Sequence, residues 1–180
     1  MEKDELNTVP AGQWRVWSGG ACRGNPGPAG WGVLVETSAG QRWTLHGNSR
    51  KSTNSRAEMY GLLQGLLAIP LDTPAVLFTD NRNNLDACYT WRKGWQARGM
   101  RTKGGPVKNA DLWPQIWEAL DARPLVRIEW VRGHSGNRGN EEVDQIATAA
   151  ADRRKAGGAA EHLVRIDLPP MVPESRDRSQ

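Results

Sequence analysis

The amino-acid sequence predicts an α/β fold in which helices flank one five-stranded mixed sheet. Three short segments with strand-like alternation come first along the chain, an order typical of an antiparallel meander. Two later apolar segments are each preceded by helical segments, a connection typical of parallel strands. With 180 residues, the chain fits one domain that buries a full core.

Each expected element rests on a local pattern. Gly and Pro residues mark a loop at 24–30, and the turn residues at 37–40 join a hairpin. The five strands are expected at residues 14–18, 31–36, 41–47, 75–79 and 126–131. Helical patterns place four helices at residues 55–69, 82–91, 92–99 and 110–122. In the first helix, Ala57, Gly61 and Gly65 form a stripe of small residues that favours close packing on a sheet.

A last helix is expected after the fifth strand. Asn140 is its expected N-cap, because an Asn side chain accepts hydrogen bonds from the free N–H groups of a first turn. Glu141 and Glu142 then lie in that turn, where their charge opposes the positive end of the helix dipole. We expect Asp144 in the same turn.

Composition divides the chain into three parts. Residues 1–12 are expected to be a flexible leader, residues 13–155 the folded domain, and residues 156–180 a polar, flexible tail. No apolar run approaches the roughly 20 residues that span a bilayer, and the charged N-terminus does not fit a signal peptide. We therefore expect a cytoplasmic monomer with no membrane partner.

The balance of charge is basic, with a formal net charge of +4 and a pI of about 9.4. This charge suits a polyanionic partner but does not by itself establish one. Cys22 and Cys88 show neither a metal-ligand spacing nor a disulfide framework, so we expect two free thiols.

Five short motifs carry the functional signal. They read V-W-S-G-G-A-C-R-G-N-P-G-P-A-G at 16–30, T-N-S-R-A-E at 53–58, F-T-D at 78–80, R-G-H-S-G at 132–136 and N-E-E-V-D at 140–144. In this order and spacing they resemble type 1 (bacterial-like) ribonuclease H, the nuclease family that cuts the RNA strand of RNA–DNA hybrids. The resemblance covers about residues 13–155. It implies the ribonuclease H-like fold and an endonuclease activity that gives 5′-phosphate products.

Three acids match the metal-binding acids of that family: Glu58, Asp80 and Asp144. Carboxylate oxygens are the ligands that Mg²⁺ prefers, and two ions about 4 Å apart activate a water molecule and stabilise the leaving oxygen. The resemblance implies that these acids bind Mg²⁺, for which Mn²⁺ can substitute. It also assigns His134 to the family's mobile histidine, which assists proton transfer or product release. A histidine suits that role because it titrates near neutral pH.

Gly19 stands where the resemblance implies a further acid, the one that bridges both metal ions in family members. No acidic residue lies between Leu6 and Val35, so no neighbour along the chain replaces it. Loss of one stabilising group in an active site lowers the rate by about 10²–10³. We therefore expect severely reduced turnover.

A basic segment between Trp91 and Ala110 contains no acidic residue. Its cations are Arg92, Lys93, Arg98, Arg101, Lys103 and Lys108. Such groups neutralise phosphates, and the segment resembles the basic protrusion of bacterial type 1 enzymes, which grips the DNA strand. Trp91 and Trp95 lie on one helix face, where they are either core residues or nucleic-acid contacts.

Further matches lie near the acids. The resemblance implies that Asn25, Asn54 and Ser55 read 2′-hydroxyls of the RNA, by which a protein distinguishes RNA from DNA. It implies that Thr53 and Asn109 hold a DNA phosphate. Ser55 replaces a commoner Asn, and Arg82 and Asn83 replace more typical residues after Asp80.

Three hypotheses follow. The first is a ribonuclease H-type endonuclease that binds RNA–DNA hybrids and retains three of four metal-binding acids. The second is a catalytically silent protein that binds hybrids or duplexes, which the intact basic segment fits. The third is an active enzyme in which Gly19 is an engineered, inactivating substitution.

Overall fold

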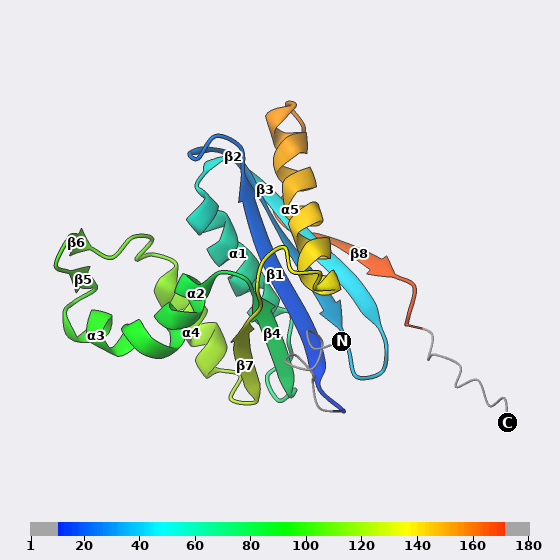
Figure 1. The fold of residues 1–180 in the computed structure, drawn as a ribbon, viewed down its shortest axis with the longest axis horizontal. Coiled ribbons are helices and arrows are strands. Elements are labelled where there is room, and N and C mark those ends of the chain that lie inside the picture. The colour runs from blue at the N-terminus through cyan, green and yellow to red at the C-terminus, as the bar shows by residue number, and fades with distance from the viewer. Residues whose placement is uncertain (1–10, 172–180) are drawn as a thin grey trace, which may run out of the picture.

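A computed structural model describes residues 11–171 of the chain. Its main element is a six-stranded mixed sheet in the order β7-β4-β1-β2-β3-β8 (Figure 1). The strands are β1 (Trp14–Cys22), β2 (Gly27–Glu36), β3 (Arg42–Ser52), β4 (Ala75–Thr79), β7 (Val126–Trp130) and β8 (Val164–Leu168). The helices are α1 (Asn54–Leu67), α2 (Arg82–Asp86), η2 (Ala87–Trp91), α3 (Arg92–Ala97), α4 (Trp113–Asp121) and α5 (Arg138–Lys155). A separate small hairpin consists of β5 (Arg101–Thr102) and β6 (Gly105–Pro106).

The connectivity confirms the predicted fold class. β1, β2 and β3 form the antiparallel meander, and β1, β4 and β7 run parallel. The predicted number of five strands is wrong, because β8 adds a sixth strand that pairs antiparallel with β3. β8 lies inside the segment 156–180, for which composition predicts a flexible tail. Its sequence, V-R-I-D-L, alternates apolar and charged residues, and the open edge of β3 supplies the pairing that a polar composition does not reveal. The expected leader at 1–12 lies almost wholly outside the described residues.

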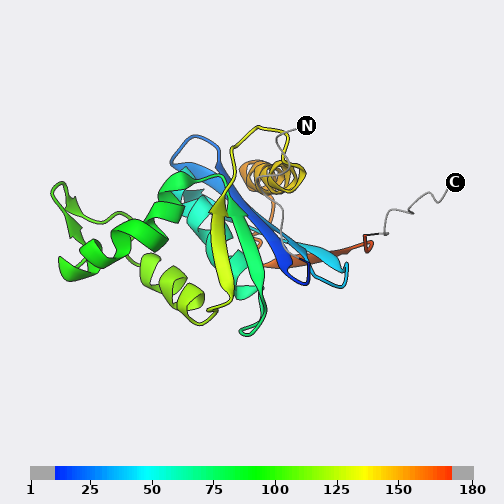
Figure 2. The same ribbon diagram turned by 60° about the horizontal axis from the view of Figure 1, so that its bottom comes forward.

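Helices cover both faces of the sheet (Figures 1 and 2). α1 and α4 lie on one face, over the larger apolar cluster, to which Val16 and Ile116 belong. α5 lies on the other face, against β1, β2 and β3. A smaller cluster beneath it contains Val143 and a stacked pair, Trp17 and Phe78, whose ring centroids are 5.4 Å apart.

The backbones of α1 and β1 approach each other with almost no space between them. A Cβ on Gly61 would lie 2.7 Å from the Gly19 carbonyl oxygen, and one on Gly20 would lie 2.8 Å from Glu58 Cα. Both distances are too short for a real Cβ, so only glycine fits without a backbone shift. The predicted stripe of small residues in α1 is therefore confirmed as the face that meets the sheet.

Two helical boundaries differ from those predicted. The expected helices at 82–91 and 92–99 form one helical run, in which η2 is a turn of π-helix. The N-cap of α5 is Asn137, not Asn140, because the Asn137 side chain accepts a hydrogen bond from the Asn140 N–H at 3.0 Å. The helix consequently begins earlier, and Asp144 lies in its second turn.

Both cysteines are free thiols, as the sequence predicts. Burial raises the pKa of the Cys88 thiol to about 12, so this side chain stays protonated in the core at neutral pH. Between residues 11 and 171, no helix combines the length and the apolar character that crossing a membrane requires.

The close approach of α1 and β1 predicts different outcomes for two glycines of one helix. Gly61→Ala should lower the free energy of unfolding by about 1–3 kcal/mol, since overpacking outweighs the gain in helix propensity of about 1 kcal/mol. Gly65→Ala is the matched control, because its Cβ would meet side chains and not backbone: Leu77 Cδ1 at 2.9 Å and Val16 Cγ1 at 3.5 Å. Urea unfolding followed by tryptophan fluorescence measures both, and equal effects would contradict the close approach.

Candidate active site and nucleic-acid interface

The three predicted carboxylates lie near two neighbouring strands, β1 and β4. Asp80 directly follows β4, and Gly19 lies in β1, which pairs in parallel with β4. Glu58 lies on α1, which packs against β1, and Asp144 lies on α5. A Cβ on Gly19 would lie 3.1 Å from Asp144 Oδ1. The fold therefore places Asp144 against the position of the missing acid, and it brings Glu58 and Asp80 near enough to act electrostatically within the same cluster.

The carboxylates lie close enough to change one another's ionisation. Burial raises the pKa of Glu58 well above its ordinary value, and the charges of Asp80 and Asp144 raise it further. Burial also raises the pKa of Asp144 to about 6, where Asp80 adds to the increase and His134 opposes it. Part of the surface of Glu58 and of Asp144 stays accessible, so a cation can reach both. Negative charge is concentrated here, and His134 offsets only part of it at Asp144.

The donor set suits a divalent cation, but the arrangement is incomplete. Carboxylate oxygens are the preferred ligands of Mg²⁺, and the raised pKa values reflect charge that a cation would neutralise. Within residues 11–171, however, no three Asp, Glu, His or Cys side chains are gathered closely enough to hold a metal ion. The position from which a further carboxylate is missing is Gly19, where a side chain would lie against Asp144.

The structure leaves room for a carboxylate at position 19. An added Cβ would meet Asp144 Oδ1 at 3.1 Å and Val143 Cγ2 at 3.2 Å. These contacts are tight, but the end of the Asp144 side chain can relieve one of them by rotating. Gly20 has no such room, because its Cβ would meet the backbone of α1. A side chain can therefore begin at position 19 with small shifts of Asp144 and Val143, whereas at position 20 the backbone of α1 would have to move.

Asn140 is a residue of this site that sequence reasoning missed. Its side chain is 1% exposed, and its Nδ2 donates a hydrogen bond to Asp80 Oδ2 at 3.3 Å. Its Oδ1 has no partner among the described residues. The Trp130 indole N–H also donates to the Asp80 carbonyl oxygen, at 3.1 Å. A helix-cap signal explained Asn140 in the sequence, and no local pattern indicated a contact with Asp80.

His134 lies in the loop between β7 and α5, the helix that carries Asp144. Its backbone φ is +53°, a left-handed conformation that few non-glycine residues adopt, and its side chain is exposed. The charge of His134 lowers the pKa of Asp144, so the two side chains share one electrostatic environment. The predicted grouping of His134 with the acids is therefore present.

The residues predicted to contact RNA gather at the start of α1. The Asn25 side chain accepts a hydrogen bond from the Asn54 backbone N–H at 3.0 Å. Thr53 is the N-cap of α1, and its hydroxyl accepts from the Arg56 N–H at 3.2 Å. Ser55 is exposed in the first turn of the same helix.

Arg56 connects two residues predicted to hold a DNA phosphate, and sequence reasoning missed it. Its backbone N–H contacts Thr53, and its guanidinium donates to Asn109 Oδ1 at 3.2 Å. The same guanidinium donates to both carboxylate oxygens of Asp111, at 2.9 and 2.6 Å. Thr53 and Asn109 therefore both contact one arginine, which lies within the T-N-S-R-A-E motif but was given no role from the sequence.

The basic segment divides into an inward-facing part and an exposed part. Arg92 donates to Asp121 Oδ1 at 2.7 Å and lies over the Trp117 ring, 5.2 Å from its centroid. Trp95 packs among tryptophans of the core. Trp91 is 39% exposed, and its ring centroid lies 5.6 Å from that of Trp95. The remaining cations are exposed around α3 and the small hairpin: Lys93, Arg98, Arg101, Lys103 and Lys108. Nucleic-acid contacts by these residues stay a prediction, which Arg92 fits least well because its charge is already paired.

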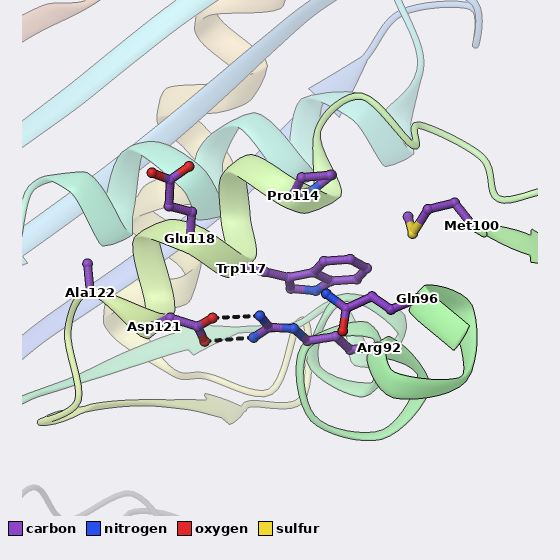
Figure 3. Close-up of a pocket in the computed structure, with 8 residues that line it drawn as sticks. All are labelled: Arg92, Gln96, Met100, Pro114, Trp117, Glu118, Asp121 and Ala122. Carbon is purple, nitrogen blue, oxygen red and sulfur yellow. Dashed lines mark hydrogen bonds and ion pairs between the residues drawn. The ribbon is translucent and has the colours of Figure 1, made fainter. Parts of the chain in front are cut away.

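An open hollow of about 620 Å³ lies between α3 and α4, apart from the carboxylates (Figure 3). The Arg92–Asp121 ion pair crosses it beside the face of Trp117. Met100 and Pro114 border the same hollow. Because it lacks the acids and the histidine, we assign it no part in catalysis.

Comparison with known proteins decides the family. The family model described as RNase H matches residues 12–152. The chain belongs to the RNase H family. Ribonuclease H of Alkalilimnicola ehrlichii is 44% identical over 147 residues, which cover 80% of this chain and 98% of that protein. Ribonuclease H of Pseudomonas putida (strain W619) is 42% identical over 142 residues, with 78% and 95% covered.

Among solved structures, LC9-RNase H1 is similar to this chain with a TM-score of 0.73 and 29% identity. The match covers 90% of this chain and 80% of that one, which is described as a type 1 RNase H with the type 2 active-site motif. Membership of the RNase H family confirms the resemblance that the five motifs indicate. The role of each site residue stays a prediction that rests on its motif and on the geometry above.

The raised pKa of Asp144 predicts how stability depends on pH. An unfolded Asp ionises near pH 3.9, whereas folded Asp144 holds its proton to about pH 6, so this group lowers stability as pH rises between those values. Asp144→Asn should therefore stabilise the metal-free protein at neutral pH, by about 1 kcal/mol for a half-exposed carboxylate. Near pH 4 the stabilisation should disappear.

Thermal melting at the two pH values tests this expectation. Asp152→Asn is the matched control of opposite sign, because the hydrogen bond from Arg23 lowers the pKa of Asp152. That substitution should leave the protein unchanged or less stable at neutral pH. A lower melting temperature for Asp144→Asn at neutral pH would contradict the predicted repulsion.

Proposed function

We propose that this protein binds RNA–DNA hybrids and hydrolyses the RNA strand, with turnover severely reduced by Gly19. Membership of the RNase H family supplies the reaction class. The observation that carries the proposal is the electrostatic cluster of Glu58, Asp80 and Asp144, in which burial and the charges of the other two acids raise the pKa of Glu58 and Asp144 lies against Gly19. The activity is assigned to residues 13–155. The two free thiols are consistent with a cytoplasmic location.

The roles of the site residues follow from their chemistry. Glu58, Asp80 and Asp144 would hold a divalent metal, Mg²⁺ or in its place Mn²⁺, which supplies Lewis-acid stabilisation at the phosphate. Hydrolysis adds the oxygen of a water molecule to phosphorus and breaks the P–O3′ bond, leaving a 5′-phosphate and a 3′-hydroxyl. His134 is placed to move a proton during this exchange. Asn140 orients the Asp80 carboxylate through its Nδ2.

Two sets of exposed residues are proposed to hold the hybrid. Asn25, Asn54 and Ser55 contact the 2′-hydroxyls of the RNA, next to the Thr53–Asn109 pair that receives a DNA phosphate. The cations of α3 and of the β5–β6 hairpin follow the DNA strand. The 2′-hydroxyl donates and accepts hydrogen bonds, so amide and hydroxyl side chains suit its recognition.

A silent hybrid-binding protein is the second candidate function. One observation favours it, because the exposed cations are retained while the carboxylate cluster lacks a member. An engineered substitution at position 19 of an active enzyme is the third hypothesis. Aspartate at this position in the genomic sequence would establish the third hypothesis and exclude a natural silent protein.

Restoring the missing acid should restore cleavage. We expect Gly19→Asp to cut a labelled RNA–DNA hybrid at least about 10²-fold faster than the original chain in Mg²⁺, because a charge-stabilising group is returned. Asp80→Asn in the Gly19→Asp background should abolish the gain. Asp152→Asn in the same background, far from the acids, should keep it.

The outcomes distinguish the hypotheses. If Gly19→Asp cleaves and the original chain does not, only one ligand is missing from the site. Full cleavage by the original chain that Asp80→Asn abolishes would refute the predicted effect of Gly19. Hybrid binding without cleavage in every variant would favour the silent protein.

The exposed cations predict a salt dependence of binding. Replacing Arg101 and Lys103 with Ala should weaken hybrid binding and reduce the slope of log K against log salt by about 0.9 for each lost phosphate contact. Arg15 and Arg127, at the opposite ends of their strands, provide a matched double substitution with the same change in charge. Fluorescence anisotropy at several salt concentrations measures both slopes, and equal slopes would place the hybrid elsewhere.

A further inference from the structure

β8 lies at one edge of the sheet, and its outer side is open. Its only strand partner within residues 11–171 is β3. Figures 1 and 2 show it at the sheet edge away from α2, α3 and α4. Four of its five residues are exposed, and the fifth is partly exposed. An open edge presents unpaired backbone N–H and C=O groups to any second strand of matching sequence.

The two sides of β8 differ in chemistry. Val164, Ile166 and Leu168 share one side of the strand, and Val164 and Ile166 are 36% and 48% exposed. Arg165 and Asp167 share the other side, where Arg165 Nε lies 2.9 Å from Asp167 Oδ1. Arg165 also lies over the Trp43 ring, 4.2 Å from its centroid. β8 therefore presents an apolar stripe and an ordered pair of opposite charges along an open edge.

We propose that β8 pairs antiparallel with β8 of a second copy of this chain, in the register centred on Ile166. A two-fold axis through this centre sets Ile166 against the partner's Ile166 and Val164 against the partner's Leu168. The same axis sets Arg165 against the partner's Asp167, and Asp167 against the partner's Arg165. Both charge pairs are then opposite in sign, and both apolar stripes lie on one side of a continuous sheet.

Charge and pairing rules together select this register. In an antiparallel pair of strands, residues directly opposite each other have their side chains on the same face of the sheet. A two-fold axis that relates two copies of one strand must therefore pass between a residue and the same residue of the partner. Centring on Arg165 would set two arginines opposite each other, and centring on Asp167 would set two aspartates opposite each other. Like charges in directly opposed positions are unfavourable, whereas opposite charges stabilise a ladder. Charged residues on an edge strand ordinarily prevent pairing with another chain, but here the Arg165 and Asp167 of one copy attract the oppositely charged residues of a second copy.

The pairing involves a short strand, so the dimer should be weak and in equilibrium with the monomer expected from the sequence. It does not depend on the proposed function. Asp80 directly follows β4, and three strands separate β8 from β4 in the sheet order. Both copies therefore keep an open active site.

Sedimentation velocity of the full chain from about 5 to 500 µM, the range of weak association, tests the proposal. We expect the original chain to shift from monomer to dimer across this range. Arg165→Glu and Asp167→Arg should each lower the association constant at least about tenfold, because each sets like charges opposite each other at two symmetric positions. Arg127→Glu, on the other edge strand β7, is the matched control and should leave association unchanged.

Mixing the two variants provides the decisive measurement. In an equimolar mixture, Glu at position 165 of one variant faces Arg at position 167 of the other, and the remaining Asp167 faces the remaining Arg165. The mixture should therefore form heterodimers although neither variant associates alone, a result that loss of folding cannot produce. A monomeric original chain, single variants that dimerise like the original, or a mixture that stays monomeric would each overturn the proposal.

Discussion

The contact between the backbones of α1 and β1 is the constraint on which the rest of the structure depends. Gly20 and Gly61 place no side chain at the points where the two backbones come closest, so the helix lies directly on the strand there. That position brings Glu58 beside the end of β1, and parallel pairing brings the end of β4 to the same place. Any larger residue at these glycines would move the helix and Glu58 with it. The packing of α1 on β1 therefore also fixes the position of Glu58 in the site.

The site holds charge that the surrounding protein does not neutralise. Burial and mutual repulsion raise the pKa of Glu58 and Asp144, which means that the folded chain tolerates an unfavourable arrangement here. The apolar clusters on both faces of the sheet supply the stability that permits it. Asn140 and Trp130 hold Asp80 at its side chain and its backbone. The absence of an acid at position 19 reduces this repulsion and leaves the cluster with three of the four carboxylates predicted to bind metal.

The sheet separates two kinds of surface. The acids and the amide and hydroxyl side chains of early α1 lie near β1 and β4, whereas the exposed cations lie on α3 and around the β5–β6 hairpin. At the opposite edge, β8 has no net charge, because its two charged side chains, Arg165 and Asp167, are opposite in sign and paired with each other. Association through that edge and binding of a polyanion at the site therefore do not compete for the same residues.

Much of this protein was determined by its sequence alone, because helices, meander strands and motif spacing depend on residues close together in the chain. The α/β class, the three acids, His134 and the RNase H family follow from such local patterns. Local patterns did not predict β8, whose partner strand lies far away along the chain. They also did not predict the contact of Asn140 with Asp80, the link from Arg56 to Asn109, or the pairing of Arg92 with Asp121. Only the tertiary structure decided these features, because each is a contact between segments that folding alone brings together.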